Sequence, residues 1–447
     1  MERVRGFGMA SDDKRIEVLR RWIEDAAKEV DANLSVRLWN GETIPLGSAV
    51  TSDLVFALND PDAIRRLIFA PNLLTAVELY VEGLLDIEGG SPLDASRAYD
   101  HMRVVRFGRS LSKIDLAKSL WPFVKPGAKG AGAKGADARA YARKVRAKFG
   151  QGREDREMIS HHYDVGNDFY RLLLGPEMVY SPGYFADPEM GLEAAERRKL
   201  DVICRKLRLQ PRDRMLDIGC GWGALACHAA RAYGAHVLGV TLSTEQRDAA
   251  VARVEREGLA DRVTIELRDY REVPPEGQFD KVAQVGMSEH LGIDNHDAHF
   301  QRVHDLLRPR GLHFHEAITR PATERIEDFR KRTVYQQIIN RYIFPGGELD
   351  HIGLTCTNME RRRLEVIDVE NVREHYERTC MLWVEKLWAN REAAEAAASH
   401  QHVRLWLFYL TLFAVGLGRG VCSTFQVVAS RRRTGPSGLP MERETFA

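Results

Sequence analysis

The larger, C-terminal part of the chain alternates apolar runs of strand length with longer segments in which apolar residues recur at helical spacing. Strands are predicted at 214–219, 235–242, 262–270, 279–287 and 312–319, and helices at 224–234, 243–258 and 298–311. Alternation of this kind, with apolar strands, is typical of a mostly parallel sheet that is covered by helices on both faces. We therefore predict an α/β fold that binds a ligand beyond the carboxyl ends of its strands.

The N-terminal part has a different pattern. Residues 13–30 have the apolar spacing of a helix, and Asn40-Gly41 lies between alternating apolar residues, which is a good hairpin signal. Residues 62–90 read as helical at first, and the pattern breaks at Gly89-Gly90. No catalytic constellation stands out in this part, and we predict a small α+β accessory domain over residues 1–124.

Residues 125–140, KPGAKGAGAKGADARA, are rich in Gly, Ala and Lys and have no apolar periodicity, which predicts a flexible linker. A second domain is predicted over residues 141–433, followed by a disordered tail over 434–447. The most apolar run lies at Leu405–Gly418. It is shorter than the roughly 20 residues that span a bilayer, so we predict a buried helix there, with an interfacial helix as the alternative.

Composition narrows the possible functions. The 65 Lys and Arg residues nearly balance the 64 Asp and Glu residues, which argues against bulk binding of nucleic acid. The six cysteines are scattered without a CxxC pair, as expected for reduced thiols in a cytoplasmic protein. The charged N-terminus has no apolar signal core, so export is not expected.

The stretch LDIGCGWG, residues 216–223, places three glycines at alternate positions after an apolar strand. A nucleoside-triphosphate loop would need GxxxxGK[ST], which is missing. A dinucleotide site would need GxGxxG and an acidic end to the second strand, where this chain has Val240-Thr241-Leu242-Ser243. A GxGxG loop preceded by Asp217 resembles motif I of the class I methyltransferases, which bind S-adenosylmethionine; other nucleotide-binding enzymes are the alternative on spacing alone.

Five further segments occur in a fixed order: HHYDVGNDFY (161–170), MVYSPGYF (178–185), GVTLSTEQ (239–246), VGMSEHLG (285–292) and RYIFPGG (341–347). Together they resemble the cyclopropane-fatty-acyl-phospholipid synthase and mycolic acid synthase family of S-adenosylmethionine-dependent methyltransferases. The resemblance extends from about residue 157 to the C-terminus, and ELYVEGLLDIEGG resembles the family's N-terminal domain. It implies the Rossmann-like sheet of a class I methyltransferase.

The resemblance also implies a reaction. The double bond of an unsaturated acyl chain in a membrane phospholipid attacks the sulfonium methyl, and the resulting carbocation loses a proton to a bound bicarbonate ion to give a cyclopropane ring. A non-cyclising outcome, with a methyl- or methylene-branched acyl chain, is the alternative. Two rival classes are a small-molecule methyltransferase, which would not need the lipid-family segments, and a non-enzymatic lipid-binding protein, which would tolerate loss of the glycine loop.

Site residues are carried over by position. Glu289, His315 and Tyr376 match the side chains that hold bicarbonate. The residues expected at the cofactor are Tyr180 and Ser181 at its carboxylate, Asp217, Gly219 and Gly221 under its methionine part, Thr241, Leu242 and Gln246 at the ribose, and Asp269 and Tyr270 at the adenine. Trp222 is expected either to line the pocket or to pack. A metal at His313, His315, Glu289 and His290 is disfavoured, because the resemblance explains His315 without one.

Two positions depart from the family. Pro182 stands where Cys is usual, in YSPGY, and proline has no N–H to donate to bicarbonate. Ser288 stands where a bulky apolar residue is common. Both changes lie where the fate of the carbocation is decided, which is the basis for the branched alternative. The expected partner is the surface of a membrane that holds unsaturated phospholipid, contacted transiently from the cytoplasm; a homodimer is also expected, and nucleic acid is not.

Overall fold

The computed structural model describes residues 5–124, 165–275 and 278–442, and the linker predicted at 125–140 lies outside them. The chain divides into one unit made of residues 1–144 and 399–411 and a second made of 145–398 and 412–447. The last five residues of the predicted tail are also outside the described part, whereas Leu439 packs against the core of the second unit.

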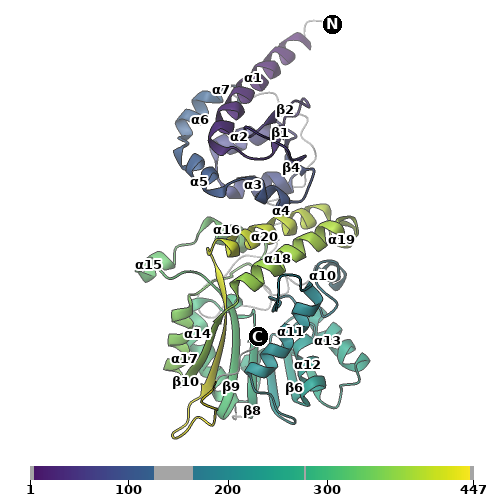
Figure 1. Cartoon of the computed structure of the whole chain (residues 1–447), viewed down its shortest axis with the longest axis vertical. Coiled ribbons are helices and arrows are strands. Elements are labelled where there is room, and N and C mark those ends of the chain that lie inside the picture. Colours follow the sequence, from purple (N-terminus) through teal and green to yellow (C-terminus); the bar gives the residue numbers. More distant parts are fainter. Residues whose placement is uncertain (1–4, 125–164, 276–277, 443–447) are drawn as a thin grey trace. The chain divides into compact units, whose positions relative to one another are not determined.

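The first unit is an α+β structure built around a four-stranded sheet in the order β2-β1-β3-β4 (Figure 1). Its elements are α1 (Arg5–Val30), β1 (Ser35–Arg37), β2 (Thr43–Pro45), β3 (Val55–Leu58), α2 (Asp62–Phe69), α3 (Leu73–Val81), β4 (Leu85–Glu88), α4 (Pro92–Arg97), α5 (His101–Ser110), α6 (Lys113–Ser119) and α7 (Trp121–Val124). The hairpin predicted at Asn40-Gly41 is confirmed, since β1 and β2 pair antiparallel and Gly41 has φ of 89°. Glycine adopts this left-handed conformation without strain.

Residues 62–90 differ in detail from the prediction. The helical pattern is split at Pro71, where Asn72 caps α3 by accepting a hydrogen bond from the Thr75 N–H. The end of the segment is strand β4, which pairs antiparallel with β3. The strand forms because Leu85 and Ile87 alternate with Asp86 and Glu88, a two-residue period that the longer helical pattern obscured.

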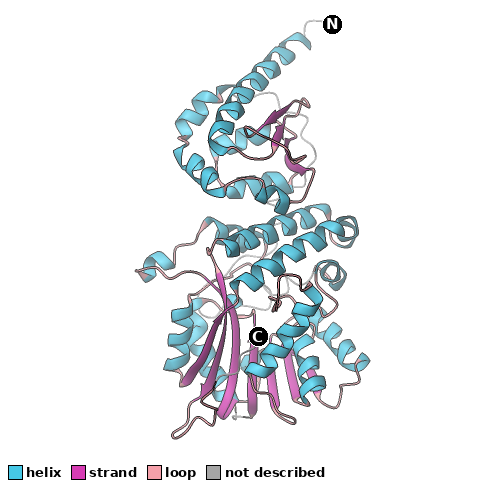
Figure 2. Cartoon of the chain, in the orientation of Figure 1, coloured by secondary structure: helices cyan, strands magenta, loops and turns pink. Residues whose placement is uncertain are grey.

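The second unit contains a seven-stranded sheet in the order β10-β11-β9-β8-β5-β6-β7, with helices on both faces (Figure 2). Its elements are α10 (Asn167–Leu173), α11 (Leu192–Lys206), β5 (Arg214–Ile218), α12 (Ala224–Tyr233), β6 (His236–Thr241), α13 (Thr244–Arg256), β7 (Val263–Leu267), η1 (Tyr270–Glu272), β8 (Phe279–Val285), η2 (Ser288–His290), η3 (Ile293–Asn295), α14 (His296–Leu306), β9 (Leu307–Thr319), α15 (Ile326–Phe329), α16 (Val334–Tyr342), α17 (Ile352–Arg361), β10 (Leu364–Asn371), α18 (Arg373–Ala389), α19 (Arg391–Ala397) and β11 (Ser423–Arg431). Strands β5 to β9 are mutually parallel, which confirms the predicted α/β class. The antiparallel strands β10 and β11 were not predicted.

One predicted boundary is wrong. The helix expected at 298–311 ends at Leu306, and β9 begins at Leu307. Pro309 is the physical reason, because proline cannot donate the helical hydrogen bond and forces the residue before it toward extended backbone.

The two faces of the sheet bury different clusters. Phe314 and Val428 pack with residues of α11 and α12 on one face. Val427 and Ala429 pack with Phe300 of α14 on the other face. Because side chains alternate along a strand, Glu316 lies on the α11 face of β9, and His313 and His315 lie on the α14 face.

Helix α20 (His400–Gly418) contains the apolar run and contributes residues to both units. Leu405, Trp406 and Leu410 are almost completely buried, which confirms the predicted buried helix. Within the first unit, Arg404 donates to the Tyr80 carbonyl at 2.7 Å and pairs with Asp86 at 2.9 Å. In the part of the chain that the structure describes, no helix is long and apolar enough to cross a membrane.

Candidate active site

A cavity opens at the carboxyl ends of β5, β6 and β8, and the glycine loop lines it. Strand β5 pairs with β6 on one side and with β8 on the other, so the chain order reverses at this point, which is where open α/β sheets bind ligands. Gly219 and Gly221 have φ of 73° and 55°. A Cβ at Gly221 would meet no atom within 4 Å, so the backbone of the loop faces open space that a ligand can approach.

All ten residues predicted for the cofactor line this cavity. They are Tyr180, Ser181, Asp217, Gly219, Gly221, Thr241, Leu242, Gln246, Asp269 and Tyr270. Trp222 also lines it, and its indole N–H donates to the Asn167 side chain at 2.6 Å. The pocket and packing roles considered for Trp222 therefore coexist.

Lys199 lines the cavity too, although it was not among the predicted site residues. It is only 2% exposed, and its ammonium donates to the Ser181 hydroxyl at 2.8 Å. Burial lowers the pKa of Lys199, while Glu316, Glu196 and Asp217 act in the opposite direction. The available signal was a lysine in the apolar stripe of α11, beside Leu200 and Ile203.

The charges in the cavity fit the amino-acid end of S-adenosylmethionine. The Asp217 Oδ2 atom is shielded from solvent and has no hydrogen-bond partner in the described structure. Burial raises the pKa of Asp217 to about 7, and Lys199 partly opposes this rise. A ligand ammonium would satisfy Asp217, and Lys199 with Ser181 offers donors for a ligand carboxylate.

The far end of the cavity is held by internal hydrogen bonds. Thr241 bonds through its hydroxyl to the Gln246 side chain at 2.8 Å, and the Ser243 side chain caps α13 at the Gln246 N–H. Asp269 accepts three side-chain hydrogen bonds from Arg271, at 2.6 to 3.1 Å. These contacts fix the side chains that were predicted at the ribose and adenine.

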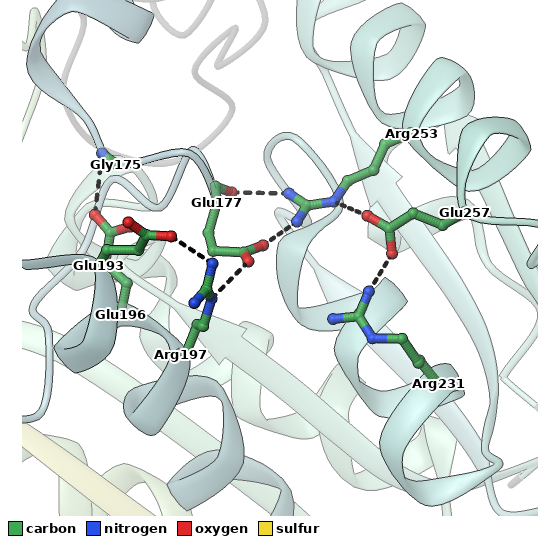
Figure 3. Close-up of polar contacts among 8 residues, drawn as sticks. All are labelled: Gly175, Glu177, Glu193, Glu196, Arg197, Arg231, Arg253 and Glu257. Carbon is green, nitrogen blue, oxygen red and sulfur yellow. Dashed lines mark hydrogen bonds and ion pairs between the residues drawn. The ribbon is translucent and has the colours of Figure 1, made fainter.

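An ion-pair network holds the loop that carries Tyr180 and Ser181 (Figure 3). Arg253, 7% exposed, donates to the Glu177 carbonyl at 2.8 Å and pairs with the Glu177 carboxylate. Glu177 also pairs with Arg197 of α11 at 3.2 Å. Burial alone would raise the pKa of Glu177, but Arg253 and Arg197 lower it by a larger amount. The pKa therefore lies below its ordinary value, and the carboxylate stays charged. The network thereby ties the loop to α11 and α13.

The three residues predicted to hold bicarbonate do not line the cofactor cavity. Glu289 follows β8; its Oε1 atom accepts the Ile318 N–H at 2.6 Å, and its shielded Oε2 atom has no hydrogen-bond partner in the described structure. Burial raises the pKa of Glu289 to about 7. Tyr376 on α18 is 7% exposed, and its ring contacts Trp383 and Phe413 edge-on at 6.0 and 5.0 Å.

His315 lies on the face of β9 that packs against α14, and the centroid of its ring is 5.5 Å from the ring centroid of Phe300. Its Nε2 atom is 3.4 Å from the Ser288 hydroxyl, which also accepts a hydrogen bond from Gln284. Gln284 in turn contacts His299, and His299 contacts the Tyr270 hydroxyl at 2.8 Å. The Ser288 hydroxyl, expected near the carbocation, is thus engaged in a buried polar network, and the catalytic role of His315 stays a prediction.

Glu316, the next residue, lies on the same face as Lys199 and was missed. Its Oε2 atom accepts a hydrogen bond from Gln426 of β11 at 2.7 Å, whereas its shielded Oε1 atom has none in the described residues. The signal in the sequence was a carboxylate inside an otherwise buried strand, HFHEAIT.

Among residues 5–124, 165–275 and 278–442, no three His, Cys, Asp or Glu side chains come together as metal ligands. The sheet topology, the glycine loop and the Asp217 oxygen that lacks a hydrogen-bond partner in the described structure are those of a class I methyltransferase. The chain is an S-adenosylmethionine-dependent enzyme of that class. The model of the mycolic acid cyclopropane synthetase family matches residues 151–427, more than half of the chain. The protein belongs to this family.

Individual relatives agree with this assignment. A probable fatty acid methyltransferase of Pseudomonas putida is 34% identical over 420 residues, covering 94% of this chain and 97% of that protein. The cyclopropane-fatty-acyl-phospholipid synthase of Escherichia coli is 38% identical over 270 residues, covering 60% and 66%. The solved structure of the cyclopropane synthase MmaA2 from Mycobacterium tuberculosis matches with a TM-score of 0.59 and 29% identity, covering 63% of this chain and 100% of that one. Mycolic acid cyclopropane synthase CmaA1, solved with SAH and CTAB, matches with the same values.

Proposed function

We propose that this enzyme methylates the double bond of an unsaturated acyl chain in membrane phospholipid and gives a cyclopropane fatty acid. S-adenosylmethionine supplies an electrophilic methyl group, which the alkene attacks. The protein positions the two reactants, keeps water away and stabilises the cation left on the neighbouring carbon. Ring closure then requires loss of a proton from the new methyl group.

An aromatic wall beside the cofactor cavity carries this proposal. Tyr180, which lines the cavity, contacts Trp383 at 5.2 Å between ring centroids, and Trp383 contacts Tyr376. Phe413 extends the wall beyond Tyr376. Aromatic faces attract a cation without reacting with it, which suits a carbocation in an acyl chain better than a charged amine or phenolate substrate.

The branched product is the second candidate, and the loop at 181–183 favours it. A bicarbonate ion as proton acceptor needs hydrogen-bond donors, but Pro182 has no N–H and the Gly183 N–H donates to the Thr379 hydroxyl at 3.0 Å. A weakened acceptor near the new methyl group would allow a proton to leave from another carbon. We expect Pro182→Cys to shift the product ratio toward cyclopropane; an unchanged ratio and rate would remove the loop from the choice of product.

We further propose transient contact with an anionic membrane through α5, α6 and α7. In these helices Leu116 is buried and Val104 and Phe107 are half-buried against the core, but Ile114 is 66% exposed and Trp121 is 53% exposed. Met102 and Val105 on α5 are also exposed. The exposed charged residues of these helices whose side chains are described are Arg103, Arg106, Arg109 and Lys118, against one Asp115. Apolar side chains beside an excess of cations are typical of interfacial helices.

Vesicle sedimentation tests this surface. Trp121→Ser with Ile114→Ser should lower binding to phosphatidylglycerol vesicles about 10²-fold or more, since each buried apolar side chain contributes about 1.5–3 kcal/mol and the two together at least about 3 kcal/mol. A matched double change of exposed apolar residues elsewhere, Val369→Ser with Val421→Ser, should leave binding unchanged. Equal binding by both variants would exclude the α5–α7 surface. A homodimer and a cytoplasmic location remain predictions, the first testable by light scattering.

The chemical structure of the modified fatty acid tests the main proposal. Purified protein is incubated with S-adenosylmethionine and vesicles of monounsaturated phospholipid, and the released fatty acids are examined by proton NMR. High-field cyclopropane signals support the synthase. Olefinic or methyl-branch signals support the second candidate, and methylation of small amines or phenols without any lipid product would refute both.

A further inference from the structure

Two buried carboxylates stand at the carboxyl ends of adjacent strands, Glu289 after β8 and Glu316 on β9. Each accepts one hydrogen bond and leaves its second oxygen shielded without a partner in the described structure, Oε2 of Glu289 and Oε1 of Glu316. A buried polar atom without a partner costs about 1–3 kcal/mol, so each of these oxygens would gain by accepting a proton. The two carboxylates interact, because Glu316 contributes to the raised pKa of Glu289.

Glu316 neighbours a residue that lines the cofactor cavity. Lys199, which lines the cofactor cavity, bonds to Ser181 and acts electrostatically on Glu316. On the other side of the loop at 181–183, the Gly183 N–H is bonded to Thr379, one helical turn after Tyr376. Glu316 therefore shares its face of the sheet with Lys199, whereas His315 faces α14.

The charges also disfavour an added anion. A bicarbonate ion beside Glu316 would be repelled by this carboxylate and would lack the donor that Pro182 cannot supply. A carboxylate that belongs to the protein adds no second anion and does not depend on a donor at residue 182. Lys199, Gln426 and Lys206 favour its charged form, although burial keeps the pKa of Glu316 above its ordinary value. A carboxylate with that environment is a competent base.

We propose that Glu316, and not bicarbonate, accepts the proton that the carbocation loses. The inference rests on the proposed methylation of the acyl double bond. A C–H bond beside the cation breaks, its electron pair forms the ring C–C bond or a new double bond, and the proton passes to Oε1 of Glu316. The neutral carboxylic acid then releases the proton to water when the products leave.

Bicarbonate dependence separates the two acceptors. The whole protein is assayed on monounsaturated phospholipid vesicles in CO₂-depleted buffer, with and without added bicarbonate, and S-adenosylhomocysteine and lipid product are both measured. The wild-type rate should change less than about twofold. Glu316→Gln should lower the rate about 10²-fold or more while the affinity for S-adenosylhomocysteine changes less than about threefold.

Chemical rescue provides the readout that a structural role would not produce. Formate should restore part of the rate of Glu316→Ala, because it can occupy the vacated space and accept the proton. Glu196→Ala is the matched control, since Glu196 is also buried, also near Lys199 and also has an unpartnered oxygen in the described structure. Formate should not rescue it.

A wild-type rate that falls without bicarbonate and returns with it would overturn the inference, and so would a Glu316→Gln variant that keeps the wild-type rate. The first of these results needs only wild-type protein, so it is obtained even if Glu316→Gln fails to fold. Absence of any lipid methylation by the wild type, with or without bicarbonate, would instead refute the proposed function.

Discussion

The unsatisfied carboxyl of Asp217 makes cofactor affinity depend on pH. In the structure its pKa is about 7, because burial penalises the charged form. A ligand ammonium binds the carboxylate and not the neutral acid, so affinity should be complete above this pKa and should fall as the pH drops below it. The test ligand is S-adenosylhomocysteine, which has the same amino-acid end as the methyl donor and no reactive methyl group.

The magnitude follows from the ionised fraction. A carboxyl with a pKa of about 7 is about 50% ionised at pH 7.0 and about 3% ionised at pH 5.5. The apparent dissociation constant scales with the inverse of that fraction, so it should rise about 15-fold over this interval, or ~1.6 kcal/mol. The ligand ammonium stays protonated throughout.

Isothermal titration calorimetry at a series of pH values measures this change. Asp217→Asn should weaken binding at pH 7.0 by about 1.5–3 kcal/mol, the value of a hydrogen bond to a charged group, and should abolish the pH dependence. Gln246→Ala is the control, since Gln246 lines the same cavity without titrating; it should weaken binding and keep the slope. Constant affinity from pH 7.0 to 5.5, or an unchanged slope in Asp217→Asn, would refute the assignment of Asp217 to the ammonium.

Two further changes test the supports of the site. Arg253→Met removes the buried charge that Glu177 and Glu257 share, so urea unfolding should show a loss of about 3 kcal/mol in the free energy of unfolding, with weaker binding of S-adenosylhomocysteine. Arg171→Met breaks an exposed pair with Asp168 and should cost less than about 0.5 kcal/mol. Equal losses in the two variants would contradict the role of the network. Ser288→Ala leaves Gln284 and His315 without their shared partner and should cost about 1–3 kcal/mol of unfolding free energy; an unaltered stability would show that the buried network re-forms without the hydroxyl.

Much of the cofactor site was predictable because it is local in sequence. A strand, a GxGxG turn and a helix follow one another directly from Arg214 to Tyr233, so their geometry is fixed by neighbouring residues. The carboxyl ends of parallel strands meet at one edge of the sheet, which explains why side chains from Tyr180 to Tyr270 converge on one cavity.

The surroundings of His315 and Glu316 were decided by tertiary structure. Alternation along β9 dictates that His315 and Glu316 face opposite ways, but it does not say which face meets Lys199. That choice depends on α11 and α12 packing against Phe314 and on β11 bringing Gln426 beside Glu316, contacts between segments more than 80 residues apart. The chain by itself therefore determined the fold class and the cofactor loop, whereas the packing of distant helices and strands decided which side chain of the pair lies on the same face as Lys199.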